Sequence, residues 1–373
     1  MTKLQKNLFM FVALMSSAFG QISCTRVIST VRQMAQEAPE NSYTSQSSKS
    51  PKLIKTLKVR DDRPFADFQR EILADFKNEN FDAIDQKANQ ARRGKERFTG
   101  GYWKINILYD ALATIYGEEF QTEQRWKTHL ETALKWKQKS PDSVTARIVL
   151  AQSYTNYGWF ARGTGFSNTV KGEDQDKLNE RLELAEQELK DAEKLKDKCP
   201  EWYEAMLFLA MARSWDAADY NKLLAEAVAF EPDYYYYHYS AAENSLPRWS
   251  GEAGDLERYA ESVAKVDSPE QNIIYYLYAS FLFSNYYSHL TNPQSINWEK
   301  AKQGYKELEK KYGIDKKRLN QYSFIAAAHE DMPEAYQAFR KIGDDWDDEV
   351  YAEKRFNELK SWAIARYEAE NKK

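Results

Sequence analysis

The sequence predicts an all-α fold of stacked antiparallel helical hairpins over residues 63–370, and three observations support this prediction. Glycine (14) and proline (10) are scarce in a chain of 373 residues in which 42% of the side chains are apolar. That composition favours helix over sheet. Stripes of apolar residues recur at the spacing of three and four residues that marks an amphipathic helix. Between these stripes lie segments that are apolar on nearly every side.

One-sided helices are predicted wherever a single apolar stripe appears. The stripes lie at residues 105–112, 126–134, 178–192, 220–228, 256–263 and 335–342. Segments that are apolar all round lie at residues 202–215 (WYEAMLFLAMARSW), 234–242 and 273–287 (IIYYLYASFLFSNYY). A helix of the second kind must be covered on more than one side. Stacked hairpins produce this alternation, because one helix of each pair is wedged between neighbours and the other faces solvent.

Prolines mark the hairpin boundaries. Pro200, Pro232 and Pro269 each follow an amphipathic helix and are 32 and 37 residues apart. Tetratricopeptide (TPR) repeats have a period of about 34 residues with proline after the second helix. The expected architecture is therefore a TPR-like α-solenoid. Residues 234–242 (YYYYHYSAA) are interpreted as the first helix of a hairpin. A strand is the alternative, because tyrosine favours strands, but no partner strand with an alternating pattern is found nearby.

The first residues predict export. Lys3 and Lys6 precede a short apolar run at residues 8–15, and small residues follow. This pattern indicates a secretory signal peptide over residues 1–20. The alternative is a lipoprotein signal that ends at residue 23 and leaves Cys24 as the lipidated N-terminus. Residues 21–62 are polar and aperiodic, which predicts a disordered linker. Either route places the protein in the periplasm or outside the cell, with membrane contact only through one N-terminal lipid.

Composition and motifs exclude several function classes. The net charge of −4 provides no overall basic field to hold nucleic acid. No two of the 4 histidines are three or four residues apart, so the usual helical zinc site is not encoded. The pair Gly163 and Gly165 lacks the third glycine and the preceding strand of a dinucleotide-binding loop. No cofactor, metal site or catalytic constellation is predicted, and the balance is against an enzyme.

Five motifs occur in order along the chain. They are residues 81–85 (FDAID), 95–104 (KERFTGGYWK), 146–154 (ARIVLAQSY), 159–166 (WFARGTGF) and 246–249 (LPRW). Over roughly residues 65–285 the chain thereby resembles an uncharacterised bacterial family, a domain of unknown function whose members look like degenerate TPR proteins and often carry an export signal. The resemblance implies the fold and carries no catalytic residues to transfer. From about Trp298 onward the repeat prediction rests on periodicity alone.

Aromatic and arginine side chains at three turns and in the tyrosine cluster are candidate partner contacts, although packing or turn formation is the simpler explanation of each. They are Trp103, Trp159, Arg162, Tyr235, His238, Arg248 and Trp249. Tryptophan, tyrosine and arginine are the side chains most enriched in binding hot spots. The expected function is an exported, non-catalytic binding or scaffold protein that engages a protein or peptide partner in the cell envelope. The alternatives are an enzyme or receptor for a small glycan or cell-wall ligand, which would use an aromatic and arginine-lined pocket, and a structural adaptor.

Overall fold

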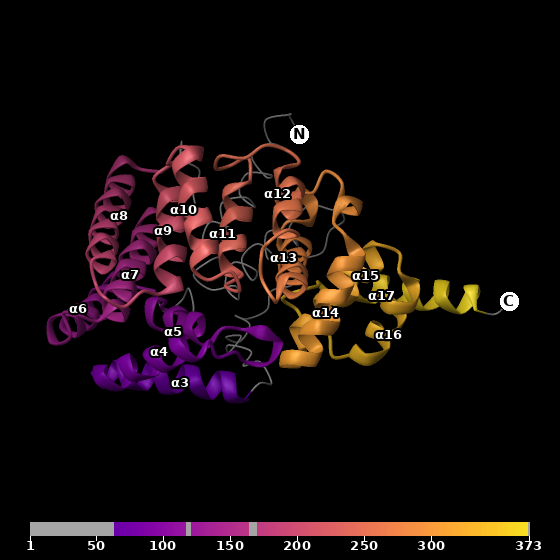
Figure 1. The fold of residues 1–373 in the computed structure, drawn as a ribbon, viewed down its shortest axis with the longest axis horizontal. Helices are drawn as coiled ribbons and strands as arrows, with labels where there is room; N and C mark the ends of the chain where they lie inside the picture. The colour runs from indigo at the N-terminus through magenta and orange to yellow at the C-terminus, as the bar shows by residue number, and fades with distance from the viewer. Residues whose placement is uncertain (1–62, 117–120, 164–169, 372–373) are drawn as a thin grey trace, which may run out of the picture.

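The structure is a computed structural model of the chain, and it describes residues 63–116, 121–163 and 170–371. The predicted signal peptide, the linker and Cys24 lie outside the described residues. The described residues form helices joined mostly by short connections (Figure 1). Within them no strand forms, and extended pairing is limited to one antiparallel bridge between Arg97 and Trp103. The predicted all-α class is therefore confirmed.

The helices follow one another along the chain with the predicted stripes on them. They are α3 (Arg63–Lys77), α4 (Phe81–Gly94), α5 (Lys104–Ala113), α6 (Glu123–Lys139), α7 (Val144–Arg162), α8 (Gly172–Glu193), α9 (Pro200–Ala212), α10 (Ala217–Phe230), α11 (Tyr236–Asn244), α12 (Asp255–Val263), α13 (Gln271–Asn285), α14 (Trp298–Tyr312), α15 (Lys316–Ala328), α16 (Met332–Ile342) and α17 (Glu353–Glu370). A 3-10 turn, η2 (Thr99–Gly101), lies between α4 and α5, and two more, η4 (Tyr287–His289) and η5 (Pro293–Ser295), lie between α13 and α14.

The helices are of two kinds, as the sequence predicts. Every residue from 273 to 283 in α13 and from 236 to 243 in α11 is buried. In contrast, α8 buries one stripe, which contains Leu178, Leu182, Ala185, Leu189 and Ala192. Helices α7, α9, α11, α13 and α15 each contact the next one in this series, and we call them the inner row. Helices α8, α10, α12 and α14 follow them in the chain and pack beside them.

The tyrosine cluster belongs to the inner row. The predicted helix forms, but it begins at Tyr236, two residues later than predicted. Tyr234 still lies in the preceding turn, where its backbone N–H donates to the carbonyl of Glu231. A buried tyrosine must place its hydroxyl group against a polar partner. Tyr239 donates to the carbonyl of Leu277 in α13 at 3.2 Å. The cluster is thus a buried helix that bonds directly to the next member of the row.

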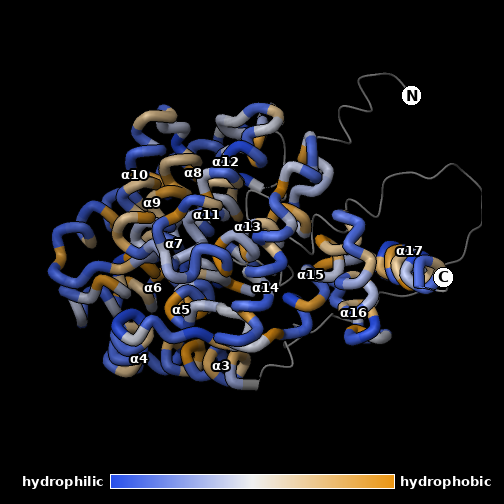
Figure 2. Tube along the Cα trace, turned by 45° about the vertical axis from the view of Figure 1, so that its right-hand side comes forward, coloured by the Kyte–Doolittle hydropathy of each residue, from blue (hydrophilic) through white to orange (hydrophobic). Residues whose placement is uncertain are grey.

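The N-terminal helices α3, α4 and α5 lie along one side of the row in two views (Figures 1 and 2). The turn after α4 extends from them to the start of α15. The N–H of Gly100 donates to the carbonyl of Gly313 at 3.2 Å, and Arg318 Nε donates to the carbonyl of Gly100 at 3.1 Å. Gly100 and Gly101 have φ angles of 78° and 75°, the left-handed region that glycine adopts without strain. Residues 218 positions apart therefore touch.

The contact between α13 and α14 predicts the effect of one added methyl group. A Cβ at Gly304 of α14 would overlap the carbonyl oxygen of Asn272 and approach Tyr276 Cβ to 2.8 Å. We expect Gly304→Ala to lower the free energy of unfolding by about 1–3 kcal/mol, measured in urea, because overpacking displaces the backbone. Gly172→Ala is the control, because a Cβ there meets nothing within 4 Å. Equal stability of the two variants would contradict the close packing of these helices.

Candidate functional site

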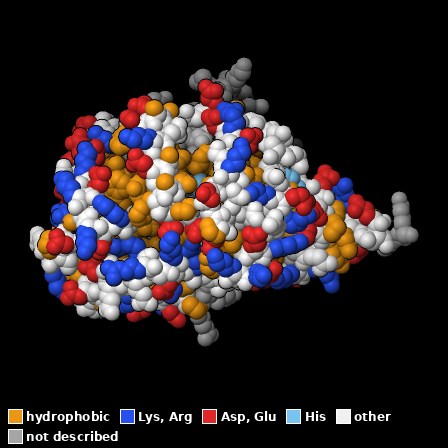
Figure 3. Space-filling view, in the orientation of Figure 1, with side chains coloured by type: hydrophobic (Ala, Val, Ile, Leu, Met, Phe, Trp, Pro, Cys, Tyr) orange, Lys and Arg blue, Asp and Glu red, His pale blue; other side chains and the backbone are white. Residues whose placement is uncertain are grey.

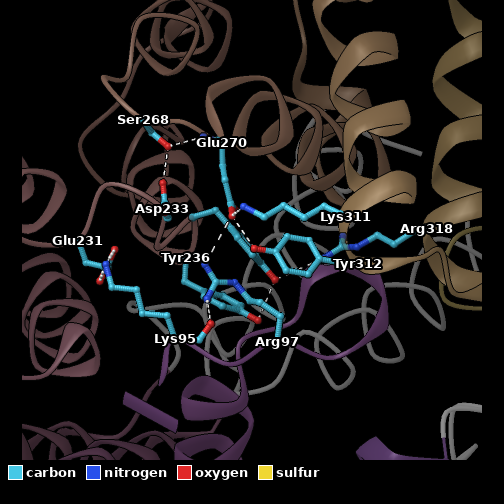
Figure 4. A network of polar contacts seen from close by, with 11 residues as sticks. Lys95, Arg97, Glu231, Asp233, Tyr236, Ser268, Glu270, Lys311, Tyr312 and Arg318 are labelled. Carbon is cyan, nitrogen blue, oxygen red and sulfur yellow. Dashed lines mark hydrogen bonds and ion pairs between the residues drawn. The ribbon is translucent and has the colours of Figure 1, made fainter. Parts of the chain in front are cut away.

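A buried arginine anchors the turn between α4 and α5, which we call the docking turn (residues 95–103), as Figure 4 shows. The guanidinium carbon of Arg97 lies 2.9 Å from the centre of the Trp103 ring and 5.8 Å from that of Tyr312. The Arg97 side chain is 4% exposed, and its ion-pair partner is Glu270 at 3.9 Å. Glu270 also accepts hydrogen bonds from Lys311 and Tyr312, each at 2.5 Å. Two rings and a carboxylate thus surround the cation.

Further contacts attach the docking turn to the segment before α11 and to the start of α15. Lys95 forms an ion pair with Glu231, just before α11, at 2.8 Å. Arg318 of α15 lies 4.5 Å from the centre of the Tyr102 ring and donates to the Tyr235 hydroxyl at 3.5 Å. The starts of α11, α13 and α15 therefore meet at one place, and the docking turn lies against all three. Sequence-predicted Trp103 and Tyr235 are both part of this junction.

Two glutamates are buried beside the docking turn. Glu201 and Glu204 are one helical turn apart on α9 and are 1% and 6% exposed. Asn106 of α5 donates to Glu201 at 2.9 Å and to Glu204 at 3.2 Å. Tyr234 donates to both carboxylates, and Gln152 of α7 donates to Glu201 at 3.2 Å. Neutral donors from three other segments thus converge on this acid pair.

The acid pair holds a proton. Burial raises the pKa of Glu201 to about 7. Burial and the neighbouring Glu201 raise the pKa of Glu204 well above its usual value. Within the described residues neither glutamate forms an ion pair with a cation. The acid pair therefore retains at least one proton at neutral pH.

The space beside the acid pair limits its chemistry. A cavity of about 30 Å³ borders Glu204, Gln152 and Thr155, and its remaining wall is apolar. This volume holds roughly one or two water molecules. Two carboxyl groups that share a proton can act as an acid–base pair on a substrate, but the space of about 30 Å³ beside this pair suits water molecules. Proton exchange is the chemistry that the geometry supports here.

Four other sequence-predicted residues come together at the opposite ends of α7 and α11. The rings of Trp159 and Trp249 meet edge to face at 6.2 Å, and Arg162 lies 5.3 Å from the Trp159 ring centre. Arg248 forms an ion pair with buried Glu243 at 3.3 Å. Trp159 is 4% exposed and Arg162 is 9% exposed. The candidate residues at the end of α7 and those that follow α11 thus meet, whereas the third candidate turn, the docking turn, lies at the other ends of these helices.

Sequence reasoning missed the acid pair, although a signal exists. Glu204 lies in WYEAMLFLAMA, a segment predicted to be covered on several sides, and Glu201 directly precedes this segment. A charged residue in such a helix must be paired, hydrogen-bonded or protonated, since burial of an isolated charge is costly. The partners Asn106 and Gln152 carried no such signal, because they lie 95 and 49 residues from Glu201.

Comparison with family models, with curated proteins and with solved structures found no match. Across the described ranges, no helix is both long and apolar enough to cross a membrane. In the same ranges, no three side chains of histidine, cysteine, aspartate or glutamate are grouped so that they could hold a metal ion.

The Arg97 site predicts a difference between buried and exposed ion pairs. Arg97→Ala removes the cation between the two rings and one partner of Glu270, so we expect the free energy of unfolding to fall by about 2 kcal/mol. Lys135→Ala is the control, because its ion pair with Glu79 is solvent-exposed and should contribute nothing measurable. Urea unfolding of both variants measures this difference. A loss no larger for Arg97→Ala than for Lys135→Ala would contradict it.

His238 predicts a loss of stability in acid. Its Nδ1 lies 2.8 Å from the Tyr259 hydroxyl, and burial lowers its pKa from 6.5 to about 4. The unfolded chain therefore binds more protons between these values, so the stabilisation is full above pH 6.5 and is lost as pH falls toward 4. We expect His238→Asn to reduce this loss by about 1.4 kcal/mol per pH unit, measured by urea unfolding from pH 7 to pH 4. An unchanged pH slope would contradict the prediction. His129, whose pKa burial also lowers to about 4, provides an independent second case.

Proposed function

We propose that the chain is an exported, non-catalytic binding protein, a TPR-like α-solenoid of the kind found in the bacterial family that its motifs resemble. It engages a protein or peptide partner in the cell envelope, either in the periplasm or held there by a lipid on Cys24. The export part of this proposal rests on the sequence of residues 1–24, outside the described residues.

The observation that carries the proposal is the inner row. Each of its helices contacts the next member, with a further helix packed beside each pair. A chain that adds one hairpin after another in this way extends its surface with every hairpin, and helical-repeat proteins use such extended surfaces for binding. The proposal of a binding protein is thus supported by the inner row, by the helices packed beside it and by the buried aromatic contacts between them.

An aromatic patch on α9 and α10 is the surface on which we expect the partner to bind. The rings of Trp202 and Tyr203 lie 5.0 Å apart, and those of Tyr203 and Phe230 lie 5.3 Å apart. Phe230 is 41% exposed although it is a large apolar side chain. Figure 3 shows hydrophobic side chains gathered over these two helices. Aromatic side chains are enriched among the residues that dominate binding energy.

Photo-crosslinking in cells tests this proposal. We expect p-benzoylphenylalanine at Tyr203 to form an adduct with a distinct protein under ultraviolet light. We expect Phe230→Ala to weaken binding of the purified partner by about 30-fold, because truncation of an interface hot spot costs about 2 kcal/mol. The same crosslinker at Leu184, which is 42% exposed on α8, is the control for exposure alone. Absence of an adduct at position 203, or equal adducts at both positions, would contradict the proposal.

Recognition of a small glycan or cell-wall ligand is the second candidate function. It is favoured by the meeting of Trp159, Arg162 and Trp249 at one place. Trp159 and Arg162 are both at least nine-tenths buried, however, and the third candidate turn is part of the separate junction around Arg97. These contacts support packing more than an open pocket, and we therefore favour a protein or peptide partner.

A further inference from the structure

We propose that the acid pair Glu201 and Glu204 makes the attachment of α5 and the docking turn to the inner row dependent on pH. The attachment is firm in mildly acidic medium and loosens as the pH rises through neutrality.

The donors to the acid pair are the residues that attach this part of the chain. Asn106 donates to both glutamates from α5. Tyr234 donates to both from the segment before α11, and its ring packs edge to face on Trp103 at 5.0 Å. Trp103 in turn lies against Arg97 of the docking turn. A change at the acid pair therefore acts directly on the contacts between α5, the docking turn and the inner row.

The groups that face the acid pair cannot neutralise the negative charge that the pair gains when Glu201 ionises. Asp110 of α5 raises the pKa of Glu204 through its own charge. Cys199, just before α9, and Tyr237 of α11 also interact electrostatically with the pair, and both are neutral or negative in every protonation state. From α7 the facing group is the uncharged amide of Gln152. Among the described residues no lysine, arginine or histidine pairs with either glutamate, so protons are the available counter-charges.

A fully buried hydroxyl and a cavity add two independent observations. Tyr237 is 0% exposed, and its hydroxyl has no hydrogen-bond partner among the described residues. The Tyr237 hydroxyl is therefore a buried polar group to which a rearranged carboxyl group of the acid pair or an entering water molecule can bond. The cavity of about 30 Å³ next to Glu204 has room for such a water molecule, which can carry protons to and from the pair.

The direction of the effect follows from the sign of the shift. The pKa of Glu201 is raised from 4.5 in the unfolded chain to about 7 in the folded chain. The folded state therefore binds more protons between these values. The stabilisation is fully present below pH 4.5 and is lost as the pH rises through about 7. This direction is opposite to that expected for His238, so the two effects are separable in one titration.

Hydrogen exchange of the full chain tests the proposal, with rates expressed as protection factors so that intrinsic pH effects cancel. The main reporter is the amide of Gly100, which donates to the carbonyl of Gly313 outside the docking turn. The amides of Phe98, Gly101 and Lys104 donate to carbonyls within residues 96–102 and report whether the turn keeps its own fold. In the wild type we expect protection of this segment to fall at least about tenfold between pH 5 and pH 8, since one unit of pKa shift corresponds to a tenfold change. In the double variant E201Q/E204Q, whose side chains are uncharged at every pH, we expect a flat profile.

E188Q is the matched control. Glu188 is a buried glutamate of the neighbouring α8, but Lys137 at 2.6 Å and Arg147 at 3.1 Å neutralise it. E188Q should therefore keep the wild-type dependence of docking-turn protection on pH. A flat profile in the wild type, or an unchanged slope in E201Q/E204Q, overturns the proposal.

A second measurement covers the case in which the double variant does not fold. The infrared carbonyl band of a protonated carboxyl group should be present in the wild type at pH 7 and weaker in E204Q. The single variant E204Q should also change the dependence of docking-turn protection on pH. Absence of the band from the wild type, or an E204Q chain with the wild-type band and slope, overturns the proposal.

Discussion

Helices α9, α11 and α13 carry apolar side chains around their whole circumference, and the rest of the structure depends on covering them. Each is covered by another member of the inner row and by the helix that follows it in the chain. The starts of α11 and α13 are in addition covered by the docking turn, through Lys95 and Arg97. Tyrosine suits these positions because it fills space like phenylalanine and still carries a hydroxyl group that can bond to a neighbouring segment. Burial and inter-helix hydrogen bonding are thus achieved by the same residues.

The junction beside α9 contains two different solutions to the burial of charge. Arg97 keeps its charge, because Glu270 and two aromatic faces replace the water that the guanidinium loses. Glu204 instead gives up its charge by retaining a proton, because its neighbours are another carboxyl group and neutral donors. The first solution is insensitive to pH near neutrality, whereas the second depends on it. Their proximity, through Trp103 and Tyr234, joins a rigid anchor to a titratable one.

The sequence was sufficient to predict what depends on local pattern. The two kinds of helix and the helical state of the tyrosine cluster follow from spacing and composition. The contacts of the docking turn were not predictable, because Gly100 and Arg318 carry no mark of each other across 218 positions. Trp103 and Tyr235 are candidates because they are aromatic, and their place in this junction appears only once the helices are assembled. The acid pair was predictable in part: the burial of its helix follows from the sequence pattern, whereas the residues that donate to it do not.

The contact between Gly100 and Arg318 also sets an order of events during synthesis. A ribosome adds about 5–20 residues per second, so roughly 10–40 s pass between the emergence of the two partners. During that interval Phe98 and Tyr102 can already pack against Phe65 of α3, but the face of Tyr102 that Arg318 covers stays without its partner. The entropy lost on closing so large a loop rises only slowly with its length, so the delay is kinetic more than thermodynamic. A nascent chain with this topology leaves part of its docking turn uncovered until α15 emerges, and shielding that part is a task for molecular chaperones.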